Sequence, residues 1–316
     1  MSTEKQSHVI AIAGGAGNLG RYLIEELLKD DRFSVVVLTR QDHPSTPISS
    51  PNLTYHQTDY TLPSLTTILT TTRATTLIST LNPPEHLYLP LHNSLLSACL
   101  ASPLCKRLIP SDWAGNVESH PSSPRAYGRT RAPFREILAQ TSGITYTSFN
   151  LGWFMDYFLP PEFSYMGFLE DEFPVDPRPE VWRYVVRGSG EEEQCWTCAR
   201  DVARAVVRLL GVEGWEPATY ITGQRGTFNE MAKLLERFYD RPFTTTHRSL
   251  EDINRSLANP SSKHELAIAE IEEWGVSGAT ACPEEKTRRQ HEEYFKGMEF
   301  LSVEEMLKKA KVEGKI

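Results

Sequence analysis

The sequence predicts an α/β protein built on a doubly wound parallel sheet. Short β-branched runs alternate with helical patterns over the first 150 residues, which is typical of a parallel sheet with helices on both faces. Evenly spaced glycines separate the first such run from the first helical pattern. The 316 residues are enough for one large or two unequal domains, and the 40% apolar composition allows a substantial core.

The predicted strands and helices follow one another in regular order. Six runs predict strands, at residues 8–14, 33–40, 52–59, 75–81, 106–112 and 143–150. The second is apolar throughout its middle, as expected of a strand that is covered on both faces. Helical patterns lie between them at 18–30, 63–72, 91–102 and 131–141. In the first helix, Leu19, Leu23 and Leu27 are four residues apart and share one face.

The pattern changes after Asn150. Residues 151–181 are rich in aromatics and prolines, and they predict no regular element. Helical patterns return at 199–210 and 228–239, and a short apolar run at about 215–225 predicts a strand that returns to the sheet. We therefore expect a first domain over residues 1–155 and a smaller α/β second domain made mainly of residues 156–316.

Charge and hydropathy exclude several classes of protein. Lysine and arginine number 33 against 41 acidic residues, a net charge of −8, so nucleic acid is not expected as a partner. No apolar run reaches the roughly 18 residues needed to cross a bilayer, and no signal peptide is evident. We expect a cytoplasmic protein, a monomer or homodimer, whose five cysteines are free thiols.

The glycine pattern "IAGGAGNLGRYL" predicts a nucleotide-binding turn. Gly14, Gly17 and Gly20 follow a predicted strand and open a predicted helix, which is the context of a dinucleotide fingerprint. The first glycine permits the tight turn, the second lets backbone approach the pyrophosphate, and the third lets helix and strand pack closely. Asn18 and Leu19 then offer backbone N–H groups at the helix N-terminus to the phosphates.

The ends of the next strands indicate which nucleotide binds. Arg40 ends the second strand, and no acid lies between Val35 and Gln41 to bond a ribose 2′-hydroxyl. An arginine suits a 2′-phosphate, so we expect NADP(H), although Arg40 could also be a solvated strand end. Asp59 closes the third strand, where it could reach an adenine amino group or cap a helix. Asn82, after the fourth strand, is a further cofactor-binding candidate.

Longer motifs make a family resemblance specific. The glycine spacing, Arg40, "RLIPSDWAGN", "YGRTRAPFREIL" and "GITYTSFNLGWFMDYF" together resemble the isoflavone reductase-like and NmrA-like family of atypical short-chain dehydrogenases. The later "ARDVARAVVRLL" and "TFNEMAKLLE" are similar to the same family's second half. The resemblance implies a Rossmann domain, a smaller substrate domain, and NADPH-dependent reduction of small, often aromatic or unsaturated carbonyl metabolites of secondary metabolism.

One position departs from the family pattern. Reductases of this family carry a lysine on the helix after the fifth strand, and Arg131 stands there, with the family's arginine four residues on at Arg135. Lysine can lose a proton and act in acid–base chemistry, whereas arginine remains charged. Arg131 can still hold a substrate oxygen and stabilise developing negative charge. The substitution therefore puts the proton-transfer step in question.

Tyr127 precedes Arg131 by four residues. On one helix this spacing would put both side chains on the same face, as in the Tyr-x-x-x-Lys of ordinary short-chain dehydrogenases. A neighbouring cation would favour the tyrosine as a proton donor or base. The alternative is a partly buried tyrosine beside a surface arginine.

The substrate contacts are expected just after the sixth strand. Asn150, Trp153, Phe154 and Tyr157 would lie at the carboxyl edge of the sheet, where open α/β folds bind ligands. Aromatic rings there suit a flat apolar substrate. The same residues could instead be core beneath the second domain.

The sequence therefore favours an NADPH-dependent reductase in which Arg131 polarises the acceptor oxygen. Two alternatives stay open because of the altered lysine. The protein could sense a nucleotide as a regulator, or it could catalyse a non-redox dehydration, isomerisation or ring closure on the same fold. "CWTC", from Cys195 to Cys198, lacks the further ligands of a zinc site, and we interpret it as incidental thiols.

Overall fold

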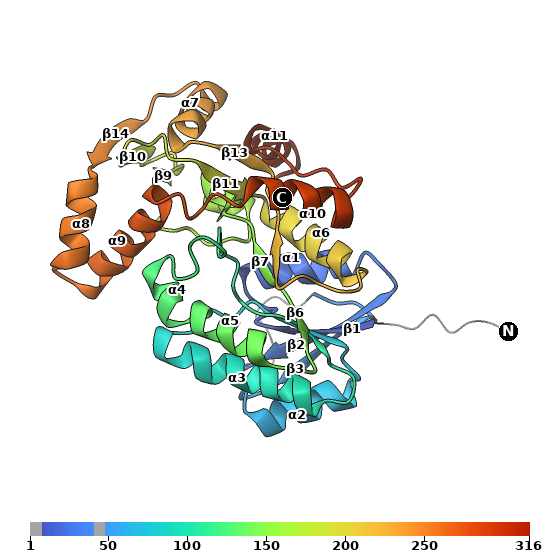
Figure 1. Ribbon diagram of the computed structural model, residues 1–316. Helices are drawn as coiled ribbons and strands as arrows, with labels where there is room; N and C mark the ends of the chain where they lie inside the picture. Colours follow the sequence, from blue (N-terminus) through green and yellow to red (C-terminus); the bar gives the residue numbers. More distant parts are fainter. Residues whose placement is uncertain (1–7, 41–47) are drawn as a thin grey trace. The chain divides into compact units, whose positions relative to one another are not determined.

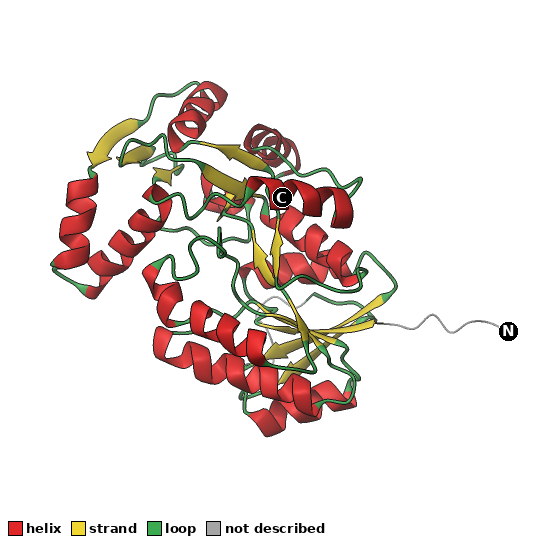
Figure 2. Cartoon of the chain, viewed as in Figure 1, coloured by secondary structure: helices red, strands yellow, loops and turns green. Residues whose placement is uncertain are grey.

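The computed structural model describes residues 8–40 and 48–316 (Figure 1). Contacts group the chain into two compact units, each with helices and strands (Figure 2). Unit 1 consists of the described parts of Met1–Asp112 with Thr130–Phe149 and Ala203–Thr219. Unit 2 consists of Trp113–Arg129, Asn150–Val202 and Tyr220–Ile316.

Unit 1 is built on a six-stranded sheet in the order β3-β2-β1-β4-β5-β6. All neighbouring strands run parallel. This is the strand order of a Rossmann dinucleotide-binding sheet, so the predicted doubly wound fold is confirmed. The strands are β1 (His8–Ala13), β2 (Phe33–Thr39), β3 (Leu53–Gln57), β4 (Thr76–Ser79), β5 (Arg107–Ile109) and β6 (Thr145–Tyr146).

Helices cover both faces of this sheet. Helix α1 (Asn18–Leu27) lies on one face, and α2 (Leu62–Thr71), α3 (Glu85–Ala101) and α5 (Arg131–Gln140) lie on the other (Figure 1). The central strands β1 and β2 are almost wholly apolar and buried because both of their faces are covered. Each fully buried aliphatic side chain there contributes about 1.5–3 kcal/mol.

Two elements of unit 1 differ from their predicted extents. Helix α3 begins at Glu85, six residues before the predicted start at residue 91, and carries Pro90 inside it. The predicted strand over 143–150 is two strands, β6 and β7 (Ser148–Asn150). β7 pairs with β12 (Ala218–Tyr220) in a separate two-stranded sheet, so the strand expected to return to the main sheet at about 215–225 pairs outside it.

The sequence predicts a single domain boundary near residue 155, but each of the two units consists of three segments of the chain. Residues 203–219, which include most of helix α6 (Ala199–Leu210), belong to unit 1. Arg107 on β5 anchors this segment, because its guanidinium donates to the carbonyls of Leu210 and Val212 at 2.7 Å each. The same guanidinium lies 3.8 Å from the ring centre of Trp215. Residues 203–219, although far from β5 in the sequence, thus form part of unit 1.

Unit 2 contains two three-stranded sheets, ordered β14-β10-β9 and β13-β11-β8. The strands are β8 (Trp153–Phe154), β9 (Val175–Asp176), β10 (Arg183–Arg187), β11 (Gln194–Thr197), β13 (Gln224–Gly226) and β14 (Thr244–Arg248). The helices are α4 (Arg125–Arg129), α7 (Phe228–Tyr239), α8 (Leu250–Ala258), α9 (Lys263–Val276), α10 (Glu284–Tyr294), α11 (Val303–Glu313) and the 3₁₀ turns η1 (Met155–Phe158) and η2 (Pro161–Phe163).

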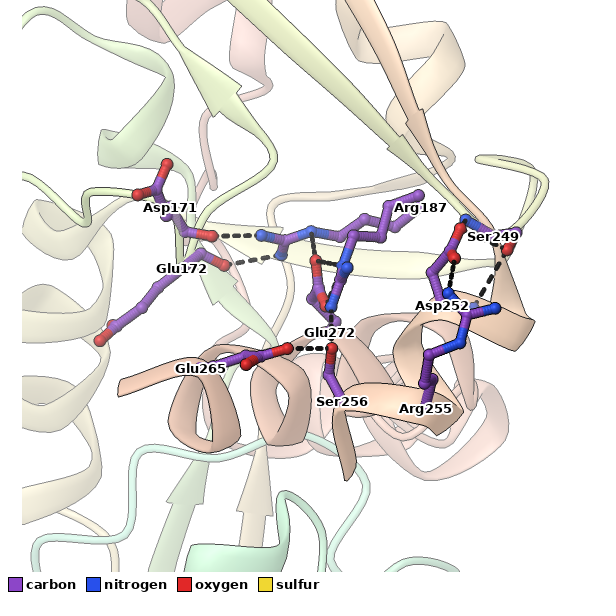
Figure 3. Close-up of polar contacts among 10 residues, drawn as sticks. Asp171, Glu172, Arg187, Ser249, Asp252, Arg255, Ser256, Glu265 and Glu272 are labelled. Atoms are coloured by element: carbon purple, nitrogen blue, oxygen red, sulfur yellow. Dashed lines mark hydrogen bonds and ion pairs between the residues drawn. The ribbon is translucent and has the colours of Figure 1, made fainter. Parts of the chain in front are cut away.

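Unit 2 has an aromatic core and a polar cluster. The core brings together Trp153, Phe158, Phe173, Trp196 and Phe228. The polar cluster joins β10, β14, α8 and α9 through charged side chains around Arg187 and Glu272 (Figure 3). Across residues 8–40 and 48–316, no helix combines the length and apolar character needed to cross a membrane.

Candidate active site

The three glycines form the turn between β1 and α1. Gly14 has φ +84°, which L side chains rarely adopt, and a Cβ there would lie 2.8 Å from Thr80 Oγ1. The Gly17 N–H donates to the Gly14 carbonyl at 2.9 Å and closes the turn. A Cβ on Gly20 would lie 2.6 Å from both the Gly14 oxygen and Gly15 Cα. Gly14 and Gly20 therefore serve the turn and the helix–strand packing.

Gly17 has a different reason to be glycine. Its φ of −84° and ψ of −176° are open to any residue. Among residues 8–40 and 48–316, the only atom that a Cβ there would meet is the Gly14 oxygen, at 3.2 Å. Gly17 is also the N-cap of α1 and gives no side-chain cap to the helix. The bare backbone and the N–H groups of Asn18 and Leu19 form a surface that suits a phosphate group.

The end of β4 lies directly beside this turn. Ala13 and Ser79 are register partners on neighbouring parallel strands. The Thr80 hydroxyl donates to the Gly14 carbonyl at 3.0 Å, and the Thr80 N–H donates to Ala13 at 2.9 Å. The chain leaves β1 toward β2 and leaves β4 toward β5, so this is the point where the strand order reverses. Ligands of open α/β sheets bind at such switch points.

The predicted nucleotide residues at the ends of β2 and β3 belong to the same unit. Arg40 is exposed directly after β2. Asp59 is exposed and accepts hydrogen bonds from the N–H and the hydroxyl of Thr61, at 2.9 and 2.8 Å, which lower the pKa of its carboxyl group. Thr61 is the N-cap of α2, so Asp59 supports the start of that helix. Its contact to adenine stays a prediction.

Arg131 and Asn82 meet at the same edge of the sheet. The Arg131 Nη2 donates to Asn82 Oδ1 at 2.7 Å, and Nη1 donates to the Thr130 hydroxyl at 3.2 Å. The Arg131 guanidinium lies 4.3 Å from the ring centre of Tyr88. Arg131 is only 8% exposed, so its charge acts where water screens it poorly. The sequence singled out both residues separately, but it did not predict that they pair.

His92 contacts Tyr88, whose ring faces Arg131, and Ser79 at the end of β4. Its ring stacks on Tyr88 with centroids 3.9 Å apart, and its two nitrogens lie 3.0 Å from the Tyr88 carbonyl and 3.2 Å from the Ser79 hydroxyl. Burial, with the nearby charge of Arg131, lowers the pKa of His92 to about 4. His92 is therefore neutral at pH 7. The signal in the sequence is the i, i+4 spacing of Tyr88 and His92, which was missed because the predicted helix began at residue 91, after Tyr88.

Acid should destabilise unit 1 through His92. An unfolded imidazole binds a proton below about pH 6.5, whereas the folded one does so only near pH 4. The unfolded chain therefore binds more protons between these values, and stability falls as the pH drops through this window. Lowering the pH from 7 to 4 should remove about 3 kcal/mol through His92 alone.

Urea unfolding at several pH values measures this effect. His92→Gln should make the pH dependence shallower by about that amount. His86→Gln, which changes an exposed histidine of the same helix α3, is the matched control. An unchanged pH dependence in His92→Gln would contradict the prediction.

The structure corrects the premise that Tyr127 and Arg131 share a helical face. Tyr127 lies in α4, which ends at Arg129, and Arg131 begins α5. Thr130 between them has φ −128° and ψ −73°, which breaks the helix. Pro133 explains the break, because it lacks an N–H and its ring would collide with the Arg129 carbonyl in a continuous helix. The two residues also belong to different units.

Helix α4 is fixed to α9 within unit 2. Arg125 forms two bonds of 2.7 Å to the carboxylate of Glu273, and Arg129 forms two bonds of 3.0 and 3.1 Å to Glu270. Such two-pronged pairs fix orientation as well as distance. Tyr127 is thus carried on a segment that is held by unit 2, and its role as proton donor stays a prediction.

The four predicted substrate residues lie at the start of the second part of unit 2. Asn150 is fully buried, and its carbonyl accepts from Ile221 N–H at 2.9 Å. Trp153 is 4% exposed in the aromatic core and donates to Gln194 at 3.2 Å, so little of its ring surface can touch a ligand. Phe154 and Tyr157 are half-buried and pack edge to face, with centroids 6.2 Å apart. These two rings remain the better candidates for substrate contact.

The cysteines are buried and free. The Cys282 N–H donates to Cys195 Sγ at 3.2 Å, and hydrogen bonding with Cys282 lowers the pKa of the Cys195 thiol to about 7. Burial raises the pKa of the Cys198 thiol. The thiol pKa values of Cys195 and Cys198 in "CWTC" are therefore shifted in opposite directions.

Comparisons with known proteins agree with the fold. No family model matches the chain. Oxidoreductase swnR of Arthroderma benhamiae is 32% identical over 300 residues, which cover 94% of this chain and 96% of that protein. A solved isoflavone reductase matches with a TM-score of 0.72 at 16% identity, over 95% of this chain and 98% of its own. A binary complex of leucoanthocyanidin reductase and NADPH from Vitis vinifera matches with a TM-score of 0.70 at 15% identity, over 96% and 99%.

The strand order and the glycine turn at the switch point define a Rossmann-type protein with the fold of isoflavone reductase, as the sequence motifs predicted. Identity at the level of 32% over nearly the whole chain is more specific than the fold. The chain belongs to the oxidoreductase family that contains swnR.

Proposed function

We propose that this oxidoreductase uses NADPH to reduce a small unsaturated or carbonyl metabolite, and that Arg131 polarises the acceptor oxygen. The observation that carries the proposal is the position of the buried Arg131, which donates to the exposed Asn82. Asn82 follows β4, next to the glycine turn after β1, and its bond to Arg131 places the guanidinium at the switch point of the sheet. A fixed cation beside a nucleotide site suits a substrate on which negative charge develops.

The residues of unit 1 fit the nucleotide. The open backbone at Gly17 and the N–H groups at the start of α1 would hold the pyrophosphate. The exposed Arg40, with no acid beside it on β2, would hold the 2′-phosphate. Asp59 and Asn82 are further proposed contacts. NADPH, when bound, supplies a hydride. The related leucoanthocyanidin reductase was solved with NADPH.

The chain's own residues would then bind and activate the substrate. Arg131 would hold the acceptor oxygen and stabilise negative charge on it, while Asn82 keeps the guanidinium in place. Tyr127, or water, would deliver the proton that arginine cannot give. The half-buried Phe154 and Tyr157 would contact a flat substrate, and the buried Asn150 and Trp153 are the other proposed substrate residues. A cytoplasmic location and a monomeric or homodimeric state belong to the same proposal.

Replacing Arg40 by alanine should remove most of the preference for NADPH over NADH. One charge-assisted contact is worth about 1.5–3 kcal/mol, or roughly ten-fold or more in affinity. Calorimetric titration of wild type and Arg40→Ala with both nucleotides measures this preference. Arg32→Ala is the control, because Arg32 is an exposed arginine of the same unit paired with Asp30. Equal affinities of the wild type for the two nucleotides would overturn the NADPH proposal.

The alternatives predict different results. A nucleotide-sensing regulator would bind NADPH and reduce none of the quinones and unsaturated ketones offered to it. A dehydratase, isomerase or cyclase would turn over its substrate with no change in NADPH absorbance. Oxidation of NADPH that depends on an acceptor supports the reductase.

A further inference from the structure

Tyr60 is a buried tyrosine with an unusual backbone directly after β3. Its φ is +62°, a left-handed conformation that is uncommon for any residue other than glycine. Its N–H donates to the Thr58 hydroxyl at 3.0 Å, which holds the chain in this shape. The side chain is 7% exposed and packs in the core of unit 1 with Ala13 and Leu38. Strained backbone of this kind is retained where the structure demands it.

The Tyr60 hydroxyl joins the two strand ends that carry the proposed nucleotide contacts. It donates to the Leu38 carbonyl at 2.8 Å, two residues before Arg40. Leu38 is the register partner of Ala13, the residue before Gly14. Burial raises the pKa of Tyr60 to about 12, while a hydrogen bond from the Gly14 backbone and the charge of Arg40 act to lower it. The phenol is therefore protonated at neutral pH and stands between the glycine turn and the strand of Arg40.

The chemistry of the nucleotide makes this spacing important. Its pyrophosphate and its 2′-phosphate are parts of one molecule, so the turn and Arg40 can engage both only when they are held at a fixed separation. NADH lacks the 2′-phosphate, so its binding does not use Arg40. A group that fixes the separation therefore affects NADPH more than NADH.

We propose that Tyr60 is a positioning residue that fixes Arg40 relative to the glycine turn and so sets the selectivity for NADPH over NADH. The inference rests on the proposed NADPH function. Tyr60→Phe removes only the hydroxyl. It should weaken NADPH binding by about three- to ten-fold, the effect of losing one hydrogen bond, and weaken NADH binding less. The affinity ratio of the two nucleotides should fall several-fold.

Calorimetric titration of the full chain with NADPH and NADH tests the proposal in a double-mutant cycle. Tyr60→Phe, Arg40→Ala and the double variant are compared with wild type. If Tyr60 acts through Arg40, the double variant should have the same affinity ratio as Arg40→Ala alone. Tyr55→Phe is the matched control. It removes a hydroxyl on β3 that bonds the backbone of Ile48, at 3.0 and 3.3 Å, and it should keep the wild-type ratio.

A purely structural role would lower the melting temperature and leave the affinity ratio unchanged. That result, or an equal loss of affinity for both nucleotides, would overturn the inference. The proposed function would still stand if Arg40→Ala removes the preference for NADPH over NADH. If Arg40→Ala leaves the ratio unchanged, the proposed NADPH contact itself is wrong. Should Tyr60→Phe fail to fold, Thr58→Val removes the acceptor that holds the Tyr60 backbone and should lower the ratio in the same direction.

Discussion

Replacing Arg131 by alanine should lower turnover by about 10² to 10³, the usual effect of removing one group that stabilises developing charge. The effect is expected to be large because the guanidinium is 8% exposed and is held by Asn82 and by the face of Tyr88. A charge fixed in this way needs no reorganisation during the reaction. The binding of NADPH should change little, because the proposed phosphate contacts lie on other residues.

The measurement is the rate of NADPH oxidation with the most active member of a panel of quinones and unsaturated ketones. Arg131→Lys should keep part of the activity, because a cation remains while the two-pronged contact is lost. The pH–rate profile adds a second readout. Tyr127→Phe should remove a basic limb of the rate if the tyrosine delivers the proton. Wild-type turnover in Arg131→Ala would show that this position is not catalytic and would favour the non-redox or sensing alternatives.

The first sheet could be predicted because its signals are local. Buried strands such as β1 and β2 are short apolar runs, and the glycine turn has a fixed spacing. The helical pattern in the sequence predicts a start at residue 91, directly after Pro90. The structure extends the helix back to Glu85 with Pro90 inside it. Tyr88 is the buried residue of these first turns, and its hydroxyl donates to the Ser111 carbonyl at 2.9 Å.

The second unit was harder to predict because its elements have weak periodicity. Strand β14 is "TTTHR", whose residues are mostly exposed, and it joins a sheet through β10, some 60 residues earlier. Helix α9 mixes apolar and acidic residues around its axis, because it buries Glu270 and Glu272 as partners for arginines. Neither element has the clean alternation on which a prediction from sequence depends.

The candidate site residues stay predictions, and the sequence did not predict how they are arranged relative to one another. The departure at Arg131 was visible in the sequence, yet its contact with Asn82 spans 49 positions and needed the sheet to bring β4 and α5 together. The expected pairing of Tyr127 with Arg131 assumed one continuous helix. Pro133, two residues after Arg131, was the signal against that assumption.

Replacing Glu272 by glutamine should destabilise unit 2 by about 3–5 kcal/mol, as expected for breaking a buried ion pair on one side. Glu272 is 2% exposed and faces two arginines (Figure 3). Its carboxylate lies 3.4 Å from Arg187 Nε and accepts from Arg248 Nε at 2.9 and 3.1 Å. Burial lowers the pKa of Arg187 to about 10 in spite of Glu272, which shows how strongly its charge is desolvated.

The other partners of Arg187 cannot replace this carboxylate. Its Nη1 donates to the Glu172 carbonyl at 2.7 Å, and its Nη2 donates to the Asp171 carbonyl. Both are neutral backbone acceptors. Glutamine at 272 would keep the shape of the side chain and remove the only negative charge that the described contacts place against Arg187 Nε. The buried cation would then lose the negative charge that interacts with it most strongly and keep only weaker interactions such as that with Asp171, and a buried charge left short of a partner destabilises the fold.

Glu273 provides a matched control one position along the same helix. It pairs with Arg125 at 2.7 Å, but both side chains are partly exposed, at 31% and 51%. Exposed pairs contribute about 0–1 kcal/mol, so Glu273→Gln should change stability little. Urea unfolding followed by tryptophan fluorescence compares the two variants. Equal, small losses in both would show that the cluster around Glu272 is solvated and contributes no more than a surface pair.

A double-mutant cycle separates two costs of Glu272→Gln: the loss of the Arg187–Glu272 ion pair, and the burial of the Arg187 guanidinium without that partner. Arg187→Met should itself destabilise, because Glu272 then loses one of its two cations. In the Glu272→Gln background the same change should be much less harmful, since it removes the uncompensated guanidinium that the first substitution created. The coupling energy should therefore be large, with the double variant more stable than the sum of the single losses predicts. Strictly additive losses would mean that Arg187 and Glu272 act independently and that packing alone sets the stability of this cluster.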